Sequence, residues 1–141
     1  AWKDAPLFMP RAIPSGWSFD GADILPKDQT TEHCAEVELD YEDLSDPDNG
    51  YLYLYEFPNK CAQPFAGAGV VAFTAGPYHG FASMDPADGQ IVQITVGVTT
   101  VQAESDLSLA DLSVVLKDLV PLNLAVKPGA IPGLGGDASA V

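Results

Sequence analysis

Two alternating apolar runs, each beside one of the chain's two cysteines, constrain the fold most strongly. In residues 35–41 apolar side chains alternate with acidic ones, a period of two that places one strand face in a core and the other in water. Residues 51–57 alternate aromatic side chains with Leu52, Leu54 and Glu56, so both faces carry apolar area. We therefore expect a β-hairpin whose second strand lies inside a sheet.

The segment between the runs predicts how they pair. Pro47 suits the second position of a turn, and Asn49-Gly50 readily adopts positive φ. A turn centred between residues 47 and 48 sets Cys34 opposite Cys61. Opposed Cβ atoms lie about 4.5 to 5.5 Å apart, just outside disulfide geometry, so a one-residue slip or a diagonal pairing is also open. We predict a Cys34–Cys61 disulfide that closes the hairpin; two unrelated buried thiols are the alternative.

A disulfide has consequences for the compartment. Disulfides persist in oxidising surroundings, so we expect an extracytoplasmic protein, secreted or membrane-anchored. No run of about 18 apolar residues is present, so we expect no membrane span in this chain. The sequence starts with Ala1 rather than Met, from which we expect a processed amino terminus that a signal peptide or anchor could have preceded.

The regions that flank the hairpin differ in character. Residues 1–31 are rich in Pro and Gly and predict an extended lead-in, with a short strand that carries Trp17 and Phe19 on one face. Residues 70–102 predict a meander of three strands; the last begins near Val92, and Gly97 suggests a bulge in it.

One helix is expected near the carboxyl terminus. Ser108 is a candidate N-cap with Asp111 in a capping-box-like arrangement, and Pro121 is expected to end the helix. Its apolar stripe is formed by Leu109, Leu112, Leu116 and Leu119. Residues 128–141 are rich in Pro, Gly and Ala and predict a tail or linker. The expected fold is an α+β domain over residues 1–127: an antiparallel sheet of about five or six strands with one main helix packed on it.

Charge limits the partners. The chain has 20 acidic and 6 basic side chains, a formal net charge of −14. Nucleic acid and anionic membrane surfaces need clustered Lys and Arg, so neither is an expected partner.

No cofactor site is predicted, and one weak metal candidate stands out. Asp43, Asp46 and Asp48 concentrate oxygen ligands of the kind that calcium prefers, although the spacing is not that of an EF-hand. A solvated acidic hairpin tip is the alternative. Two cysteines without closely spaced histidines cannot form a structural zinc site.

No catalytic motif is found, so we expect a protein that is not an enzyme. The chain lacks the G-x-S-x-G motif, and both cysteines are assigned to the disulfide. A small hydrolase that uses His33 or His79 with acidic residues is the alternative from a different class.

Tyrosines provide the candidate interaction surface. Tyr51, Tyr53 and Tyr55 share one face of the second run, and tyrosine rows occur both in cores and at recognition surfaces. We expect this row to be part of the core. If the helix instead covers the face of Leu52 and Leu54, the row is a candidate docking surface, and Trp17 is a further candidate residue of that surface.

The order of these features resembles a known kind of domain. A P-x-G-W lead-in at Pro14, Gly16 and Trp17, the segment YLYLYEF and the segment VGVTTVQAESDLSLADLSVVLKDL, within residues 14–122, resemble extracytoplasmic domains of unknown function in actinobacterial lipoproteins and membrane-anchored proteins associated with anti-sigma factors. The resemblance implies a binding, sensing or assembly role and no catalytic residue.

We therefore expect a non-enzymatic extracytoplasmic interaction or sensing module that binds a partner protein in the cell envelope. A structural accessory subunit of an envelope membrane complex and a small-ligand-binding domain remain alternatives.

Overall fold

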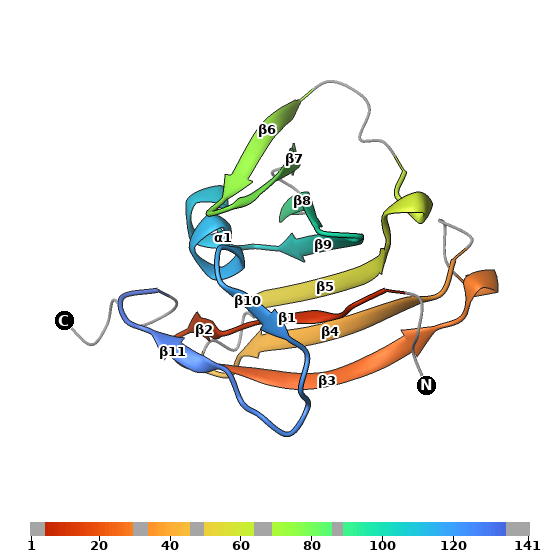
Figure 1. Cartoon of the computed structure of the whole chain (residues 1–141). Helices are drawn as coiled ribbons and strands as arrows, with labels where there is room; N and C mark the ends of the chain where they lie inside the picture. Colours follow the sequence, from red (N-terminus) through yellow and green to blue (C-terminus); the bar gives the residue numbers. More distant parts are fainter. Residues whose placement is uncertain (1–4, 30–33, 46–49, 64–68, 86–88, 135–141) are drawn as a thin grey trace.

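The computed structural model describes residues 5–29, 34–45, 50–63, 69–85 and 89–134 (Figure 1). The elements are β1 (Phe8–Pro10), β2 (Ala12–Pro14), β3 (Trp17–Leu25), the 3-10 turn η1 (Lys27–Gln29), β4 (Glu36–Asp43), β5 (Tyr51–Pro58), η2 (Asn59–Cys61), β6 (Val70–Ala75), β7 (Tyr78–Asp85), β8 (Gly89–Val96), β9 (Thr99–Ser105), α1 (Leu109–Leu116), β10 (Leu119–Pro121) and β11 (Gly129–Ile131).

Seven strands form the main sheet, in the order β3-β4-β5-β9-β8-β7-β6, and every neighbouring pair is antiparallel. The predicted fold class is confirmed, since the structure is mostly antiparallel sheet with one α-helix among the described residues. The strand number is higher than the expected five or six. Gly97, with φ of 62°, is part of a tight turn rather than a bulge, so β8 and β9 are separate strands.

The predicted disulfide is present, although the hairpin register differs from the expected one. Val37 pairs with Glu56, a register that would set Cys34 opposite Asn59. The η2 turn then carries Cys61 back towards Cys34, and their Cα atoms lie 6.1 Å apart. The backbone N–H of Asn59 donates to the Val98 carbonyl at 3.0 Å and helps to hold this turn.

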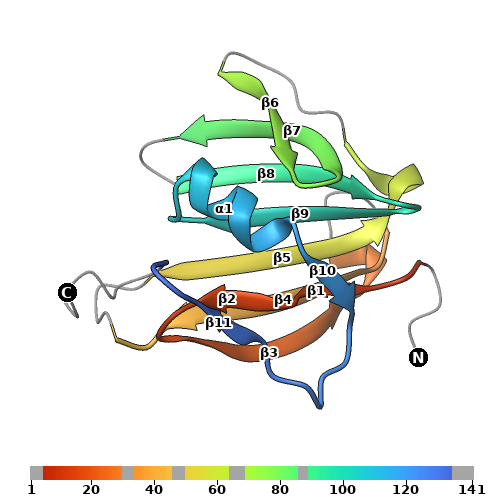
Figure 2. The ribbon, with the colours of Figure 1, turned by 60° about the vertical axis from the view of Figure 1, so that its left-hand side comes forward.

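One face of the main sheet carries the hydrophobic core. Leu39, Leu52 and Leu54 are fully buried there and belong to the same cluster as Leu112 and Leu116 of α1. Burial of each such side chain stabilises the fold by about 1.5 to 3 kcal/mol. Figure 2 shows α1 and the short strands β1, β2, β10 and β11 in front of this face.

The α1 helix begins as expected but ends earlier. Ser108 caps it, and its Oγ accepts from the Asp111 backbone N–H at 3.1 Å. The helix ends at Leu116 and β10 begins at Leu119, so the expectation that Pro121 ends the helix is wrong. Eight residues are too few to cross a bilayer, and no helix in the described part of the chain has the required length and apolar character.

The two ends of the chain meet over the core. β10 pairs antiparallel with β1, and β11 pairs in parallel with β2. The Ser15 N–H donates to the Leu134 carbonyl at 3.0 Å. A domain boundary at residue 127 is therefore too early, because Gly129–Ile131 is part of the folded unit. Residues 135–141 of the expected tail lie outside the described residues.

A buried carboxylate ties the amino-terminal segment to the centre of the sheet. Glu56 of β5 is 0% exposed on the core face, and its Oε1 accepts from the Phe8 N–H at 2.7 Å. Thr99 Oγ1 donates to the Pro6 carbonyl at 2.6 Å beside it. These two contacts fix the start of β1 over β5 and β9.

Candidate interaction face

The face of the main sheet opposite the core combines tyrosines with carboxylates. Register sets Glu38, Asp40 and Glu42 of β4 directly opposite Tyr55, Tyr53 and Tyr51 of β5, respectively. On the other side of β5, Tyr53 lies opposite Glu104 of β9. We call this set, together with Asp23 of β3 opposite Glu38, the acidic tyrosine face.

The tyrosines are not core, contrary to expectation. Tyr51, Tyr53 and Tyr55 are half-buried, whereas Leu52 and Leu54 between them are fully buried on the other face. The Tyr51 and Tyr53 ring centroids lie 5.1 Å apart with the ring planes tilted by 32°. The aromatic rings therefore form a partly solvent-accessible row along the central part of the sheet.

Three carboxylates converge beside this row. Oxygen atoms of Asp23, Glu38 and Asp40 all lie within 4.8 Å of one another. Burial, followed by the charges of Glu38 and Asp23, raises the pKa of Asp40 to about 6. The cluster therefore concentrates negative potential that a bound positive charge would relieve.

Tyr53 and Tyr55 stay neutral at physiological pH. Burial, followed by the charge of Glu104, raises the pKa of Tyr55, and burial with the charge of Asp40 raises that of Tyr53. Neutral phenols offer their π faces and hydroxyls to a ligand. The face as a whole thus presents fixed negative charge around aromatic rings, an arrangement suited to Lys and Arg side chains.

Trp17 lies on the other side of the sheet. It pairs with Asp43 at the end of β3, and its indole packs against the core cluster together with Phe19. Trp17 and the tyrosines therefore do not form one surface.

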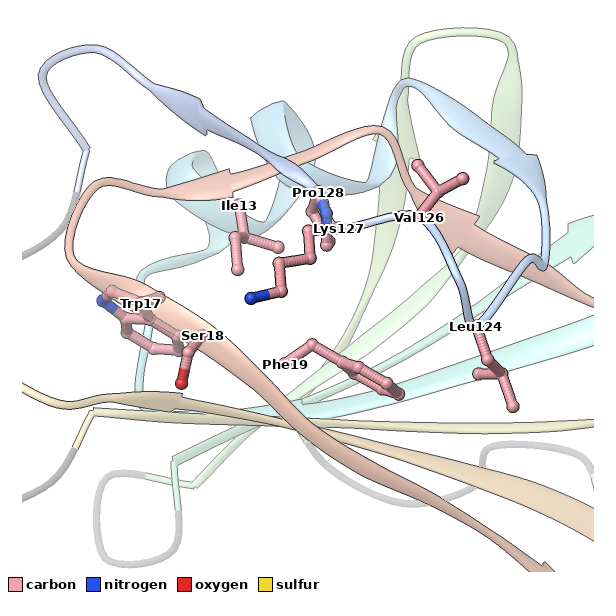
Figure 3. A pocket seen from close by; sticks show the side chains of 8 residues that line it. All are labelled: Ile13, Trp17, Ser18, Phe19, Leu124, Val126, Lys127 and Pro128. Atoms are coloured by element: carbon pink, nitrogen blue, oxygen red, sulfur yellow. The ribbon is translucent and has the colours of Figure 1, made fainter.

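A pocket of about 200 Å³ lies beside Trp17, between β2, β3 and the segment that leads into β11 (Figure 3). Its walls are mostly apolar, and the Lys127 ammonium group projects between the Trp17 and Phe19 side chains. Leu124 and Val126 are more than half exposed at its rim. No carboxylate is among the described residues that line it.

The calcium candidate is only partly described. Asp46 and Asp48 lie outside the described residues. Asp43 is 7% exposed, and its Oδ1 accepts from Ser45 N and Ser45 Oγ at 3.0 and 2.6 Å. The Asp43 carboxylate is therefore already hydrogen-bonded to Ser45 at the end of the hairpin.

The acidic cluster that the structure does contain was missed from the sequence, because Asp23 reaches Glu38 and Asp40 only through strand pairing. The alternation of Glu38 and Asp40 along β4 was the available clue.

The histidines show no catalytic arrangement in the described part of the chain. His33 lies outside it. His79 is exposed on β7, and its Nδ1 lies 3.4 Å from Thr74 Oγ1, a hydroxyl rather than a carboxylate. The geometry therefore assigns no proton-transfer partner to His79.

The chain matches no known family profile, no curated protein and no solved structure. The acidic tyrosine face accordingly has to be interpreted from its own chemistry.

Proposed function

We propose that this protein is an extracytoplasmic interaction module of the cell envelope that binds a basic segment of a partner protein on the acidic tyrosine face. The observation that carries the proposal is the placement of the Tyr51, Tyr53 and Tyr55 row, outside the core and between carboxylates on both neighbouring strands. The disulfide is compatible with an oxidising compartment.

Charge favours a basic partner. With a net charge of −14, the protein attracts cationic segments and repels acidic ones over the screening length of about 8 Å at physiological salt. Exposed ion pairs contribute about 0.2 to 1 kcal/mol each, and a cation over a tyrosine ring adds about 0.5 to 1 kcal/mol. Several such contacts along one sheet face are needed for micromolar affinity, which favours a peptide segment over a single small cation.

Direct binding of a defined peptide tests the proposal. The probe is a short peptide of alternating lysine and threonine, titrated by calorimetry against the full chain; the same peptide with glutamate in place of lysine is the negative control. We expect Tyr53→Ala to weaken binding by about tenfold or more, as at interface hot spots, and Asp40→Asn to weaken it less. Asp111→Asn is the matched charge control, since it removes one carboxylate from α1 on the other side of the sheet.

Two outcomes would contradict the proposal. If Asp111→Asn weakens binding as much as Asp40→Asn, net charge rather than this face attracts the peptide. If Tyr53→Ala has no effect, the tyrosine row is not part of the site. Because protonation removes the Asp40 charge, affinity should also fall as the pH is lowered through about 6, and this fall should be shallower in Asp40→Asn.

A small amphipathic anion in the pocket of Figure 3 is the second candidate ligand. The apolar walls favour this class, and so does the Lys127 ammonium group, which shares the pocket with no carboxylate from the described part of the chain. The test is fluorescence of anilinonaphthalene sulfonate with the folded protein. Lys127→Gln should lower its binding, whereas Lys60→Gln, at the exposed η2 turn, should not. Equal binding to both variants would remove this candidate.

A further inference from the structure

Among the residues that the structure describes, the β6 strand is an unpaired edge of the main sheet. It has β7 as its neighbour on one side and is the last strand in the order β3-β4-β5-β9-β8-β7-β6. A two-residue turn, Gly76 and Pro77, joins it to β7, so Ala75 and Tyr78 form the first hydrogen-bonded pair. Alternation along an antiparallel ladder then directs the N–H and C=O groups of Val70, Ala72 and Thr74 away from β7.

One side-chain contact supports this assignment. Ser113 Oγ of α1 donates to the Thr74 carbonyl at 2.8 Å, which requires that carbonyl to point away from β7. The helix therefore occupies the Thr74 end of the edge. No residue in the described part of the chain bonds the outward amide and carbonyl groups of Val70 and Ala72, which can therefore pair with another strand.

Apart from α1 at its Thr74 end, β6 lacks the charged side chains and prolines by which proteins often protect edge strands. Between Lys60 and Asp85 the sequence carries no Asp, Glu, Lys or Arg. Val71, a β-branched residue on β6, is 43% exposed. By contrast, the opposite edge strand β3 carries Asp23 and an irregular register next to Gly21, both of which discourage pairing.

The charge distribution favours a second copy of this chain at β6. The acidic strands β3 and β4 lie at the other end of the sheet, as Figure 1 shows. Six strand spacings of about 4.8 Å separate the two edges by roughly 29 Å along the sheet, several times the screening length of about 8 Å. Contact through β6 keeps the acidic regions of two copies far apart, whereas contact through β3 brings them together.

We propose that two copies of this chain associate through antiparallel pairing of β6 with β6, centred on Val71. Val70 of each copy then pairs with Ala72 of the other, and the four hydrogen bonds use only the free backbone groups. The two exposed Val71 side chains meet across the two-fold axis and become covered. The β6 strand of a second copy suits this edge, because it carries no charged side chain that pairing would bury.

The dimer is expected to be weak because the pairing is short. We expect half-dimerisation on the order of 100 µM, weaker than in complexes with interfaces of standard size. Salt above the physiological level should change the association little, whereas lower salt should weaken it, because each copy carries a net charge of −14 that is then less screened. It does not depend on the proposed basic partner, although a dimer would present two acidic tyrosine faces at its two ends.

Sedimentation of the full chain at increasing concentration tests this inference. We expect a concentration-dependent shift from monomer to dimer in the native sequence. Val71→Lys and Ala72→Pro should each weaken the association by at least about tenfold, the first by charge repulsion and the second by loss of an edge N–H. Val98→Lys is the matched control, because Val98 is 62% exposed at the β8–β9 turn, and it should associate like the native chain.

A native chain that stays monomeric at millimolar concentration would overturn the inference, even if β6 then accepted a strand of another protein. Unchanged association in Val71→Lys would overturn the role of this edge. Val71→Lys alone suffices if Ala72→Pro does not fold, because the Val71 side chain is substantially exposed and not part of the core cluster.

Discussion

The native protein should lose stability as the pH rises, because the buried carboxyl group of Glu56 then ionises. Replacement of Glu56 by glutamine should remove this pH dependence. Glu56 is 0% exposed on the core face of β5, and burial raises its pKa to about 8, despite the opposing effect of the Phe8 N–H that it accepts. Its second oxygen, Oε2, has no hydrogen-bond partner among the described residues. The charged form is therefore poorly accommodated in the folded state.

The sign and size follow from linkage. Because the folded pKa is raised, the folded state holds this proton more tightly than the unfolded state does. The resulting stability is fully present below 4.5, the ordinary pKa of a glutamic acid, and is lost as the pH rises through the folded-state pKa of about 8. Within that window the free energy of unfolding falls by about 1.4 kcal/mol per pH unit, to a total of at most about 5 kcal/mol.

Urea denaturation of the native chain and Glu56→Gln between pH 5 and pH 9 measures this effect. The glutamine keeps an oxygen for the Phe8 N–H but cannot ionise. The difference in unfolding free energy should be small at pH 5, grow with pH in favour of the variant, and level off above about pH 8. A difference that stays constant with pH would refute the reasoning. Glu56→Leu should destabilise at pH 5 by about 1 to 3 kcal/mol, because it leaves the Phe8 N–H without an acceptor.

Three further changes test the fold. Simultaneous Cys34→Ser and Cys61→Ser should lower the free energy of unfolding by about 3 to 4 kcal/mol, since the bridge closes a loop with a sequence separation of 27; equal urea midpoints with and without the bridge would contradict this. Gly50→Ala should destabilise and alter tryptophan fluorescence, because a Cβ there would lie 2.6 Å from Trp17 Cζ2; an unchanged emission spectrum would argue against that packing. Ser108→Ala should lower the thermal midpoint by an amount that corresponds to about 1 kcal/mol, and Ser108→Asp should restore it.

Local features were predictable from the sequence. The alternation in β4 and β5 and the Ser108 cap each depend on a few neighbouring residues, and the disulfide joins the two cysteines of the chain; the structure contains all three. The exact register was not predictable, because residues 59–61 leave the strand in a 3-10 turn that still brings the cysteines together.

The face of the tyrosines could have been inferred. The predicted hairpin and the observed one both have a turn centred between two residues. In any such register, Leu39 of β4 lies on the same face as the leucines of β5, and Glu38 lies on the same face as the tyrosines. Because residues 51–57 are apolar on both faces, that strand alone does not decide which face is buried. The polar alternation of its partner decides it.

Long-range features had no local signal. β10 and β11 are three residues each, and they pair with β1 and β2 across more than a hundred residues of sequence. The sequence predicts one strand where the structure has β8 and the central strand β9, because Gly97 is the single turn-forming residue between them. Convergence of Asp23 with Glu38 and Asp40 likewise requires knowledge of how β3 pairs with β4.

The most direct test of the central claim is a titration of the isotopically labelled full chain with the lysine and threonine peptide, followed by amide chemical shifts in nuclear magnetic resonance. The account predicts that the largest changes map to β4, β5 and β9, around Tyr53 and Asp40, and that they disappear in high salt. Shifts centred on the core-side segments near Arg11 and Lys127, or no shifts at millimolar peptide, would contradict it.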